Sequence, residues 1–287
     1  MIQNTEELPV VIYKSGAQKG SFKQLLASMQ KDLRDSRELS WRLFIRDVSA
    51  QYRQSIFGFL WVFIPPIVTS LIFIMLQSRN IINFGKTDIS YPAYVIIGTL
   101  LWQIFVDGLN APLKAATAAQ PLLAKINFPH EALLISSFYM VAFNALVKFA
   151  IIVVVIFLFR LTPAWGVLLS PILVLLLILL GLAVGILLTP IGLLYSDVAS
   201  ALPILVQLAF FVTPVVYKTP DTFPFSLIGV INPVSPLLTA ARDLLTKGMT
   251  SATVALAVVA VLTIVLVFAG WIYFRVALPV IIERMSA

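Results

Sequence analysis

The residues that could do chemistry in this sequence are few and far apart. Asn144 and Lys148 lie four residues apart, on one helical face, inside a long apolar run. A charge at such depth in a membrane is costly unless it is paired or wetted. Lys148 therefore indicates either a structural ion pair, with Asp107 or Asp197 as its partner, or contact with an anionic group of a substrate. Both interpretations stay open on the sequence alone.

Other reactive groups do not assemble into a recognisable catalytic set. Phe84-Gly85-Lys86-Thr87 ends like a phosphate-binding loop, but Asn80 stands where that motif requires its first glycine. With no cysteine and one histidine, His130, the sequence predicts neither a thiol nucleophile nor a cysteine- or histidine-rich metal site. Acid–base chemistry needs groups that converge, and the carboxylates here are scattered. We expect no catalytic residue, no metal site and no cofactor.

Composition sets the class of protein. The 287 residues are 60% hydrophobic and 11% charged, with a mean hydropathy of +0.99, whereas soluble domains are about 45–50% apolar and about 25% charged. The sequence therefore predicts an all-α, polytopic membrane protein. Its net charge of +7 is concentrated beside apolar runs, so it indicates membrane topology rather than nucleic-acid binding. Residues 1–14 lack the pattern of a cleavable signal.

Six apolar runs are long enough to cross about 30 Å of hydrocarbon as helices. We expect them near residues 59–77, 91–109, 133–159, 167–194, 198–217 and 251–274. Nine lysines and arginines precede the first run, whereas the next loop holds only Arg79 and Lys86. This asymmetry predicts that both termini are cytoplasmic. It divides the chain into a cytoplasmic segment (1–58), a six-span domain (59–274) and a cytoplasmic tail (275–287).

The segment 39–58 is expected to form an amphipathic helix that leads into the first span. Its apolar stripe lies at helical spacing, and cations occupy the other faces. The stripe consists of Trp41, Phe44, Ile45, Val48, Tyr52 and Ile56. Because the sequence offers no soluble core for this helix to join, we expect it to lie along the membrane surface with its cations among lipid headgroups.

Two connecting segments look structured. Residues 217–250, on the predicted outer side, contain four prolines and apolar pieces too short to span, which favours a re-entrant segment over a loose loop. On the inner side, residues 122–126 form a candidate short helix that is closed by Phe128-Pro129. An apolar helix facing the cytoplasm indicates a docking element for a protein partner.

Proline and aromatic residues mark the spans themselves. Pro203 and Pro214 are expected to kink the fifth span, and Gly181 and Gly185 permit close helix approach in the fourth. Aromatic residues gather in the second and fifth spans, where they form an interfacial belt, pack in the core or stack on sugar rings. As candidate substrate contacts we take Tyr94, Trp102, Phe105, Phe210, Phe211 and Tyr217, together with Lys148.

From residue 41 to 245, the order and spacing of these pieces resemble the membrane subunit of ABC exporters that carry polysaccharides and polyol phosphates. That family includes the O-antigen, capsule and teichoic-acid export permeases. The resemblance is carried by Arg46-Asp47, Tyr52-Arg53, Gly58-Phe59-Leu60-Trp61, Pro65, Tyr91-Pro92, Gly98, Leu101-Trp102, Leu123-Ala124-Lys125, Phe128-Pro129, Asp197-Val198, Pro203, Thr213-Pro214-Val215 and Asn232-Pro233.

The resemblance implies a homodimer of six-span subunits in the bacterial inner membrane, bound to two ATPase subunits that hold ATP and Mg²⁺. The substrate would be a lipid-linked (undecaprenyl diphosphate) polysaccharide, most simply O-antigen, passing through a channel at the dimer interface. The segment 122–128 matches the coupling helix of such permeases, and 39–52 their interfacial connecting helix. The implied coupling residues are Arg46, Asp47, Tyr52, Arg53, Leu122, Leu123, Lys125, Phe128 and Asp197.

Two positions depart from the pattern of the family. Ser196 precedes Asp197 where an arginine is usual, and His130 follows Phe128-Pro129 where an arginine is frequent. Both changes remove a cation from the side expected to face the ATPase.

Three alternatives stay open. A capsule or teichoic-acid exporter would carry a more anionic substrate and is expected to show more pathway cations than Lys148 alone. A membrane-embedded lipid-glycan enzyme would need converging acid–base or metal groups. A proton-coupled transporter usually shows inverted repeats and several intramembrane carboxylates, and the sequence indicates neither.

Overall fold

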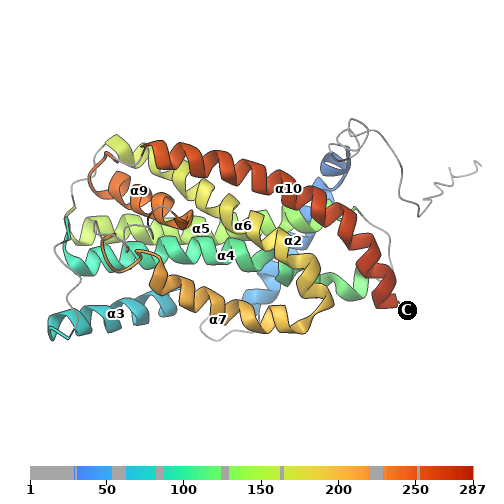
Figure 1. Ribbon diagram of the computed structural model, residues 1–287, viewed down its shortest axis with the longest axis horizontal. Helices are drawn as coiled ribbons and strands as arrows, with labels where there is room; N and C mark the ends of the chain where they lie inside the picture. The colour runs from blue at the N-terminus through green and yellow to red at the C-terminus, as the bar shows by residue number, and fades with distance from the viewer. Residues whose placement is uncertain are drawn as a thin grey trace, which may run out of the picture.

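The computed structural model describes residues 29, 31–53, 63–81, 87–123, 129–161, 165–219, 229, 231–250 and 253–286. These residues fold mainly into helices (Figure 1). Within the described ranges, four helical stretches are long and apolar enough to cross a membrane, which fits the predicted all-α integral membrane class. The helices are α2 (Arg37–Arg53), α3 (Ile64–Ser78), α4 (Tyr91–Leu123), α5 (Glu131–Leu158), η2 (Trp165–Leu169), α6 (Ser170–Leu194), α7 (Ser196–Val212), α9 (Val234–Thr246) and α10 (Thr253–Ser286).

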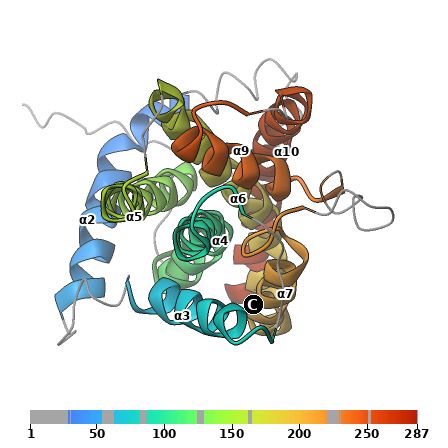
Figure 2. The same ribbon diagram turned by 90° about the vertical axis from the view of Figure 1, so that its left-hand side faces the viewer.

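Helix α4 lies at the centre of the bundle, with α5, α6, α3, α7 and α9 around it (Figure 2). Its tightest neighbour is α6, because glycines on both helices let the backbones touch. A Cβ atom on Gly181 would lie 2.4 Å from the carbonyl oxygen of Phe105, and one on Gly185 would lie 2.4 Å from that of Leu109. The predicted close approach at Gly181 and Gly185 is confirmed, since small residues are what permit such packing between apolar helices.

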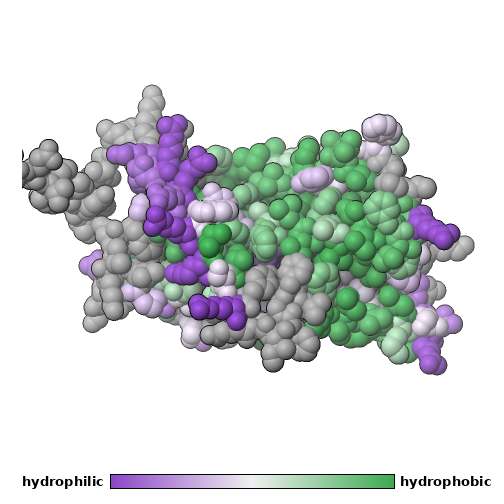
Figure 3. Space-filling view, turned by 180° about the vertical axis from the view of Figure 1, so that it is seen from behind, coloured by the Kyte–Doolittle hydropathy of each residue, from purple (hydrophilic) through white to green (hydrophobic). Residues whose placement is uncertain are grey.

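On the face drawn in Figure 3, an apolar surface lies between two hydrophilic ends. Exposed apolar side chains are numerous on α5 and α10. Only 33% of the most apolar stretch of α5 is buried, and only 17% of that of α10. In water such a surface would be an aggregation liability or an interaction site. An exposed apolar surface of this kind fits contact with lipid or with other membrane-embedded chains.

The first and fifth predicted spans correspond to shorter helices. Helix α3 has 15 residues and α7 has 17, which is about 22 and 26 Å at 1.5 Å per residue and therefore short of about 30 Å of hydrocarbon. The predicted end of the fifth span at Tyr217 was wrong. Helix α7 continues through Pro203 but ends at Val212, because Thr213 precedes Pro214 and is extended (φ −84°, ψ 139°).

Two helices run well beyond the predicted spans. Helix α4 passes the predicted end at residue 109 and reaches Leu123, through an alanine-rich stretch that favours helix although it is less apolar. Leu122 and Leu123 therefore belong to the last turn of α4 and do not begin a separate helix. Residues 124–128 lie outside the described residues. Helix α10 likewise continues past residue 274 to Ser286, so most of the predicted tail is helical.

Helix α2 packs on the apolar helix α5, a contact that the sequence did not predict. Leu43 and Phe44 of α2 are buried, whereas Trp41 and Ile45 are exposed by 55% and 45%. Phe44 contacts the rings of Tyr139 and Phe143 of α5 at centroid distances of 6.0 and 6.1 Å. The exposed part of the stripe is the part that remains free to meet lipid. Residues 54–62 lie outside the described residues.

Candidate functional site

Three aromatic residues of the second and fifth predicted spans, Trp102, Phe105 and Phe210, meet in one cluster between α3, α4 and α7. Trp102 lies 5.4 Å from Phe105 and 6.1 Å from Phe210, measured between ring centroids. Phe210 also contacts Phe73 at 5.9 Å and Phe211 at 5.6 Å. Edge and tilted contacts of this kind stabilise aromatic pairs beyond the area that they bury.

Exposure divides this cluster. Trp102, Phe105 and Phe210 are buried, at 5%, 8% and 9% exposure, whereas Phe211 is 58% exposed. In a single chain, therefore, Phe211 is the exposed ring of the cluster, and it packs edge-on against the buried ring of Phe210. The substrate contacts predicted for these residues stay predictions.

Lys148 forms an ion pair with Asp107, which links α5 to α4. Of the two partners that the sequence allowed, the structure shows Asp107, while Asp197 is exposed in the first turn of α7. The Lys148 side chain is only 5% exposed and that of Asp107 is 31% exposed. One turn before Lys148, the Oδ1 atom of Asn144 is buried without a hydrogen-bond partner among the described residues. The charge of Lys148 is thus balanced by that of Asp107, and this ion pair links α5 to the central helix α4.

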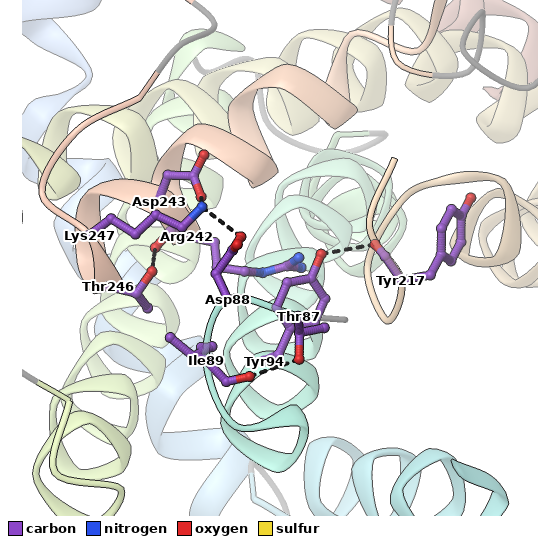
Figure 4. A network of polar contacts seen from close by, with 9 residues as sticks. All are labelled: Thr87, Asp88, Ile89, Tyr94, Tyr217, Arg242, Asp243, Thr246 and Lys247. Carbon is purple, nitrogen blue, oxygen red and sulfur yellow. Dashed lines mark hydrogen bonds and ion pairs between the residues drawn. The ribbon is translucent and has the colours of Figure 1, made fainter. Parts of the chain in front are cut away.

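A second polar cluster lies where α9 meets the start of α4 and the end of α7 (Figure 4). Arg242 of α9 is 2% exposed. Its Nη2 donates to the carbonyl oxygens of Val215 at 2.7 Å and of Pro214 at 3.3 Å, and its guanidinium carbon lies 3.7 Å from the ring centroid of Tyr94. Cation–π contact of a desolvated guanidinium is worth about 2 kcal/mol. The Nε and Nη1 atoms have no hydrogen-bond partner among the described residues.

The segment between Thr213 and Tyr217 is held from several sides. Besides the bonds from Arg242, the Tyr94 hydroxyl donates to the carbonyl oxygen of Tyr217 at 2.9 Å (Figure 4). The Asn232 amide donates to the Thr213 hydroxyl oxygen at 2.8 Å. Gly98 makes room for this arrangement, since a Cβ atom there would lie 2.2 Å from the Val215 carbonyl oxygen. The chain after α7 is therefore fixed to α4 and α9.

An exposed ion-pair network continues this cluster. Lys247 lies 2.7 Å from a carboxyl oxygen of Asp88 and 3.1 Å from one of Asp243. The hydrogen bond from Lys247 lowers the pKa of Asp88. Partial burial acts to lower the pKa of Lys247, but the hydrogen bonds to both carboxylates outweigh it and the pKa is raised. Because the groups are exposed, such pairs contribute about 0–1 kcal/mol each.

The predicted coupling residues are only partly described. Arg46 and Asp47 form an exposed pair at 2.8 Å, and Arg53 and Asp197 are exposed. The side chains of Tyr52, Leu122 and Leu123 lie outside the described residues, as do Lys125 and Phe128. Their predicted role as a docking surface stays a prediction. No group of three or more potential metal ligands is present in the described part of the chain.

Sequence reasoning missed Arg242, and it also missed Arg275, which pairs with Glu131 and Asp32. A signal for Arg242 was present, because it interrupts the apolar piece 234–245 and a lone cation in such a setting must find partners. Arg275 gave a weaker signal. It directly follows the sixth predicted span, where a cation is ordinary.

Comparison with known proteins places these features in context. No family model matches the chain. An O-antigen export system permease protein RfbA from Myxococcus xanthus is 29% identical over 217 residues, 73% of this chain and 81% of that protein. Two permeases of the same name from Klebsiella pneumoniae are 25% and 23% identical, each over 71% of this chain and 78% of their own length. These matches agree with the resemblance of the sequence to the permease subunits of polysaccharide ABC exporters.

Proposed function

We propose that this chain is the permease subunit of an ATP-driven exporter that moves a lipid-linked polysaccharide, with O-antigen as the favoured cargo, out of the cytoplasm. The observation that carries the proposal is the similarity to three proteins named as O-antigen export permeases, over about 70% of the chain. The long apolar helices agree with a transport subunit. Hydrolysis of ATP would belong to two copies of a separate subunit.

The proposed assembly is a homodimer whose channel lies between the subunits. Helices α3 and α7 support this arrangement because both present large apolar side chains outward, beside the aromatic cluster. The exposed residues include Ile67, Leu71 and Met75 of α3, and Leu205, Leu208 and Phe211 of α7. In a dimer joined through these helices, the ring of Phe211 would stand close to the channel. Tyr94, Trp102, Phe105, Phe210 and Tyr217 would support that lining, and aromatic rings suit a neutral sugar chain.

We further propose six spans, with α9 in a re-entrant segment and both termini cytoplasmic. Ten of the 13 residues of α9 are buried, although the helix is too short to cross a bilayer. The absence of cysteine from the sequence makes this topology testable with single introduced cysteines. Met249→Cys, at an 81% exposed site, should react with a membrane-impermeant maleimide on intact cells. Lys114→Cys should react only after permeabilisation, and the reverse pattern would refute the orientation.

The test of function is purification of the chain from its native cell in mild detergent. An ATPase subunit should accompany it, and Leu122→Asp or Phe128→Asp should release that subunit. Thr117→Asp, exposed on the same helix as Leu122, is the matched control and should retain it. Deletion of the chain should leave lipid-linked glycan inside the cell, and analysis of that glycan identifies the cargo as O-antigen, capsule or teichoic acid.

An assembly that is stable in several detergents and contains no ATPase would contradict the proposal. The membrane-embedded lipid-glycan enzyme would then become the leading hypothesis.

A further inference from the structure

Arg275 holds three parts of the chain together at the predicted cytoplasmic end of the bundle. Its Nη1 donates to a carboxyl oxygen of Glu131, at the start of α5. Its Nη2 lies 2.5 Å from a carboxyl oxygen of Asp32, in the N-terminal segment. These partners are 144 and 243 residues away in sequence. A guanidinium can hold two carboxylates at once because its donors are arranged in a rigid fork.

The contact through Asp32 reaches the whole of α2. The backbone amide of Ser36 donates to the carbonyl oxygen of Asp32 at 2.9 Å, and that of Ser40 donates to Ser36 at 2.8 Å. The hydroxyls of both serines bond to the same two carbonyl oxygens. The N-terminal segment is thereby continuous with α2, which in turn packs on α5 through Phe44.

Arg275 adds a direct polar link between helices that otherwise meet through the centre of the bundle, where α5 and α6 pack on each other and on α4. Helix α10 packs on α6 and α9, whereas α2 packs on α5. The ion pairs of Arg275 connect these two sets of helices. Glu131 is only 5% exposed, and a buried charge that loses its partner is strongly destabilising, so the pair with Arg275 is costly to break. Burial and the nearby charge of Arg275 also lower the pKa of His130, the preceding residue.

The position of Glu131 gives this connection a functional meaning. It lies three residues after Phe128, the end of the predicted docking segment. A displacement imposed on that segment by an ATPase would act on α4, which carries Leu122 and Leu123, at one end and on Glu131 at the other.

We propose that Arg275 is a positioning residue for energy coupling: with Glu131 and Asp32 it forms a clamp that transmits movement of the docking segment to α10 and α2. This inference rests on the proposed function, because it requires an ATPase at the docking segment. Beyond that function, it identifies the residues that transmit the motion. The coupling travels through a contiguous charged network, and such networks carry coupling between sites typically as 5–150-fold effects.

The experiment compares variants of the full chain, purified with its ATPase. The variants are Asp32→Asn, Arg275→Gln and the pair Arg275→Gln with Glu131→Gln. The paired variant guards against misfolding, since it does not leave the buried charge of Glu131 without its partner. Arg284→Gln, on an exposed residue of the same helix, is the matched control. The readouts are ATPase retained, ATP hydrolysed and glycan exported.

We expect the paired variant to retain the ATPase and hydrolyse ATP while export per ATP falls about tenfold, and Asp32→Asn to show a smaller fall in the same ratio. Arg284→Gln should behave as wild type. A purely structural role would lower the amount of complex but leave the ratio of export to ATP hydrolysis unchanged.

Spin labels at Asp35→Cys and Val280→Cys, both exposed sites, give a second readout, in complexes diluted with unlabelled subunits.

In the wild-type background, the distance between these labels within one subunit should stay narrowly distributed with and without trapped ATP. It should broaden in the paired variant. Wild-type export per ATP in both the paired variant and Asp32→Asn would overturn the clamp and leave the proposed function intact. Failure of the wild-type chain to retain any ATPase would instead overturn the proposed function, and the clamp with it.

Discussion

Replacing Lys148 by methionine separates a structural role from a role in substrate passage. The change removes the cation from a pair whose lysine is 5% exposed and leaves Asp107, 31% exposed, without it. Breaking a buried pair by removing one partner costs about 3–5 kcal/mol, and we expect about 3 kcal/mol because Asp107 keeps some access to its surroundings. For a chain of this size that lowers the melting temperature by roughly 6–12 °C.

The assay is thermal unfolding of the detergent-purified protein, followed by size-exclusion chromatography and combined with glycan export in cells. Lys148→Met with Asp107→Leu should recover most of the lost stability, because an apolar pair of similar volume replaces a buried ion pair at little cost. We expect this double variant also to export. A stable double variant that does not export would refute the structural interpretation and assign Lys148 to the pathway. A stable Lys148→Met single variant would refute the energetic argument.

Three further predictions concern helix packing, the polar cluster around Arg242 and the pH dependence of stability. Gly181→Ala should destabilise the chain by about 1–3 kcal/mol, since its Cβ meets backbone atoms of α4. Gly192→Ala is the control in the same thermal assay, because the atoms nearest to its Cβ belong to the side chain of Leu113. Arg242→Lys should lower the stability of the chain and increase proteolysis of the segment after α7. The ammonium group of a lysine cannot reproduce the planar guanidinium that binds the Val215 carbonyl and stacks on the ring of Tyr94. Unchanged proteolysis would contradict this prediction. Burial lowers the pKa of His130 below its usual 6.5. The stability that neutral His130 contributes is therefore present above pH 6.5 and is lost as the pH falls through the lowered pKa of the folded chain, because the unfolded chain binds the proton first. His130→Asn should weaken this pH dependence of the melting temperature.

The sequence determined the features that depend on local chemistry. Hydropathy placed apolar helices close to their observed positions, since each run must bury its own backbone groups and is read over consecutive residues. Gly181 and Gly185 indicated close packing because a missing Cβ is a local property. The same logic explains one error. Hydropathy ends a span at residue 109, but α4 continues to Leu123 through an alanine-rich stretch that also contains Pro112 and Pro121.

Only the tertiary structure decided which distant groups meet. Asp107 and Asp197 were equivalent partners for Lys148 in the sequence, and the packing of α4 on α5 selected Asp107. Arg242 found carbonyl groups and the ring of Tyr94, and Arg275 found Asp32 across 243 residues. Such pairs are absent from any local pattern, because ion pairs and hydrogen bonds depend on distances of a few ångströms that helix packing alone creates.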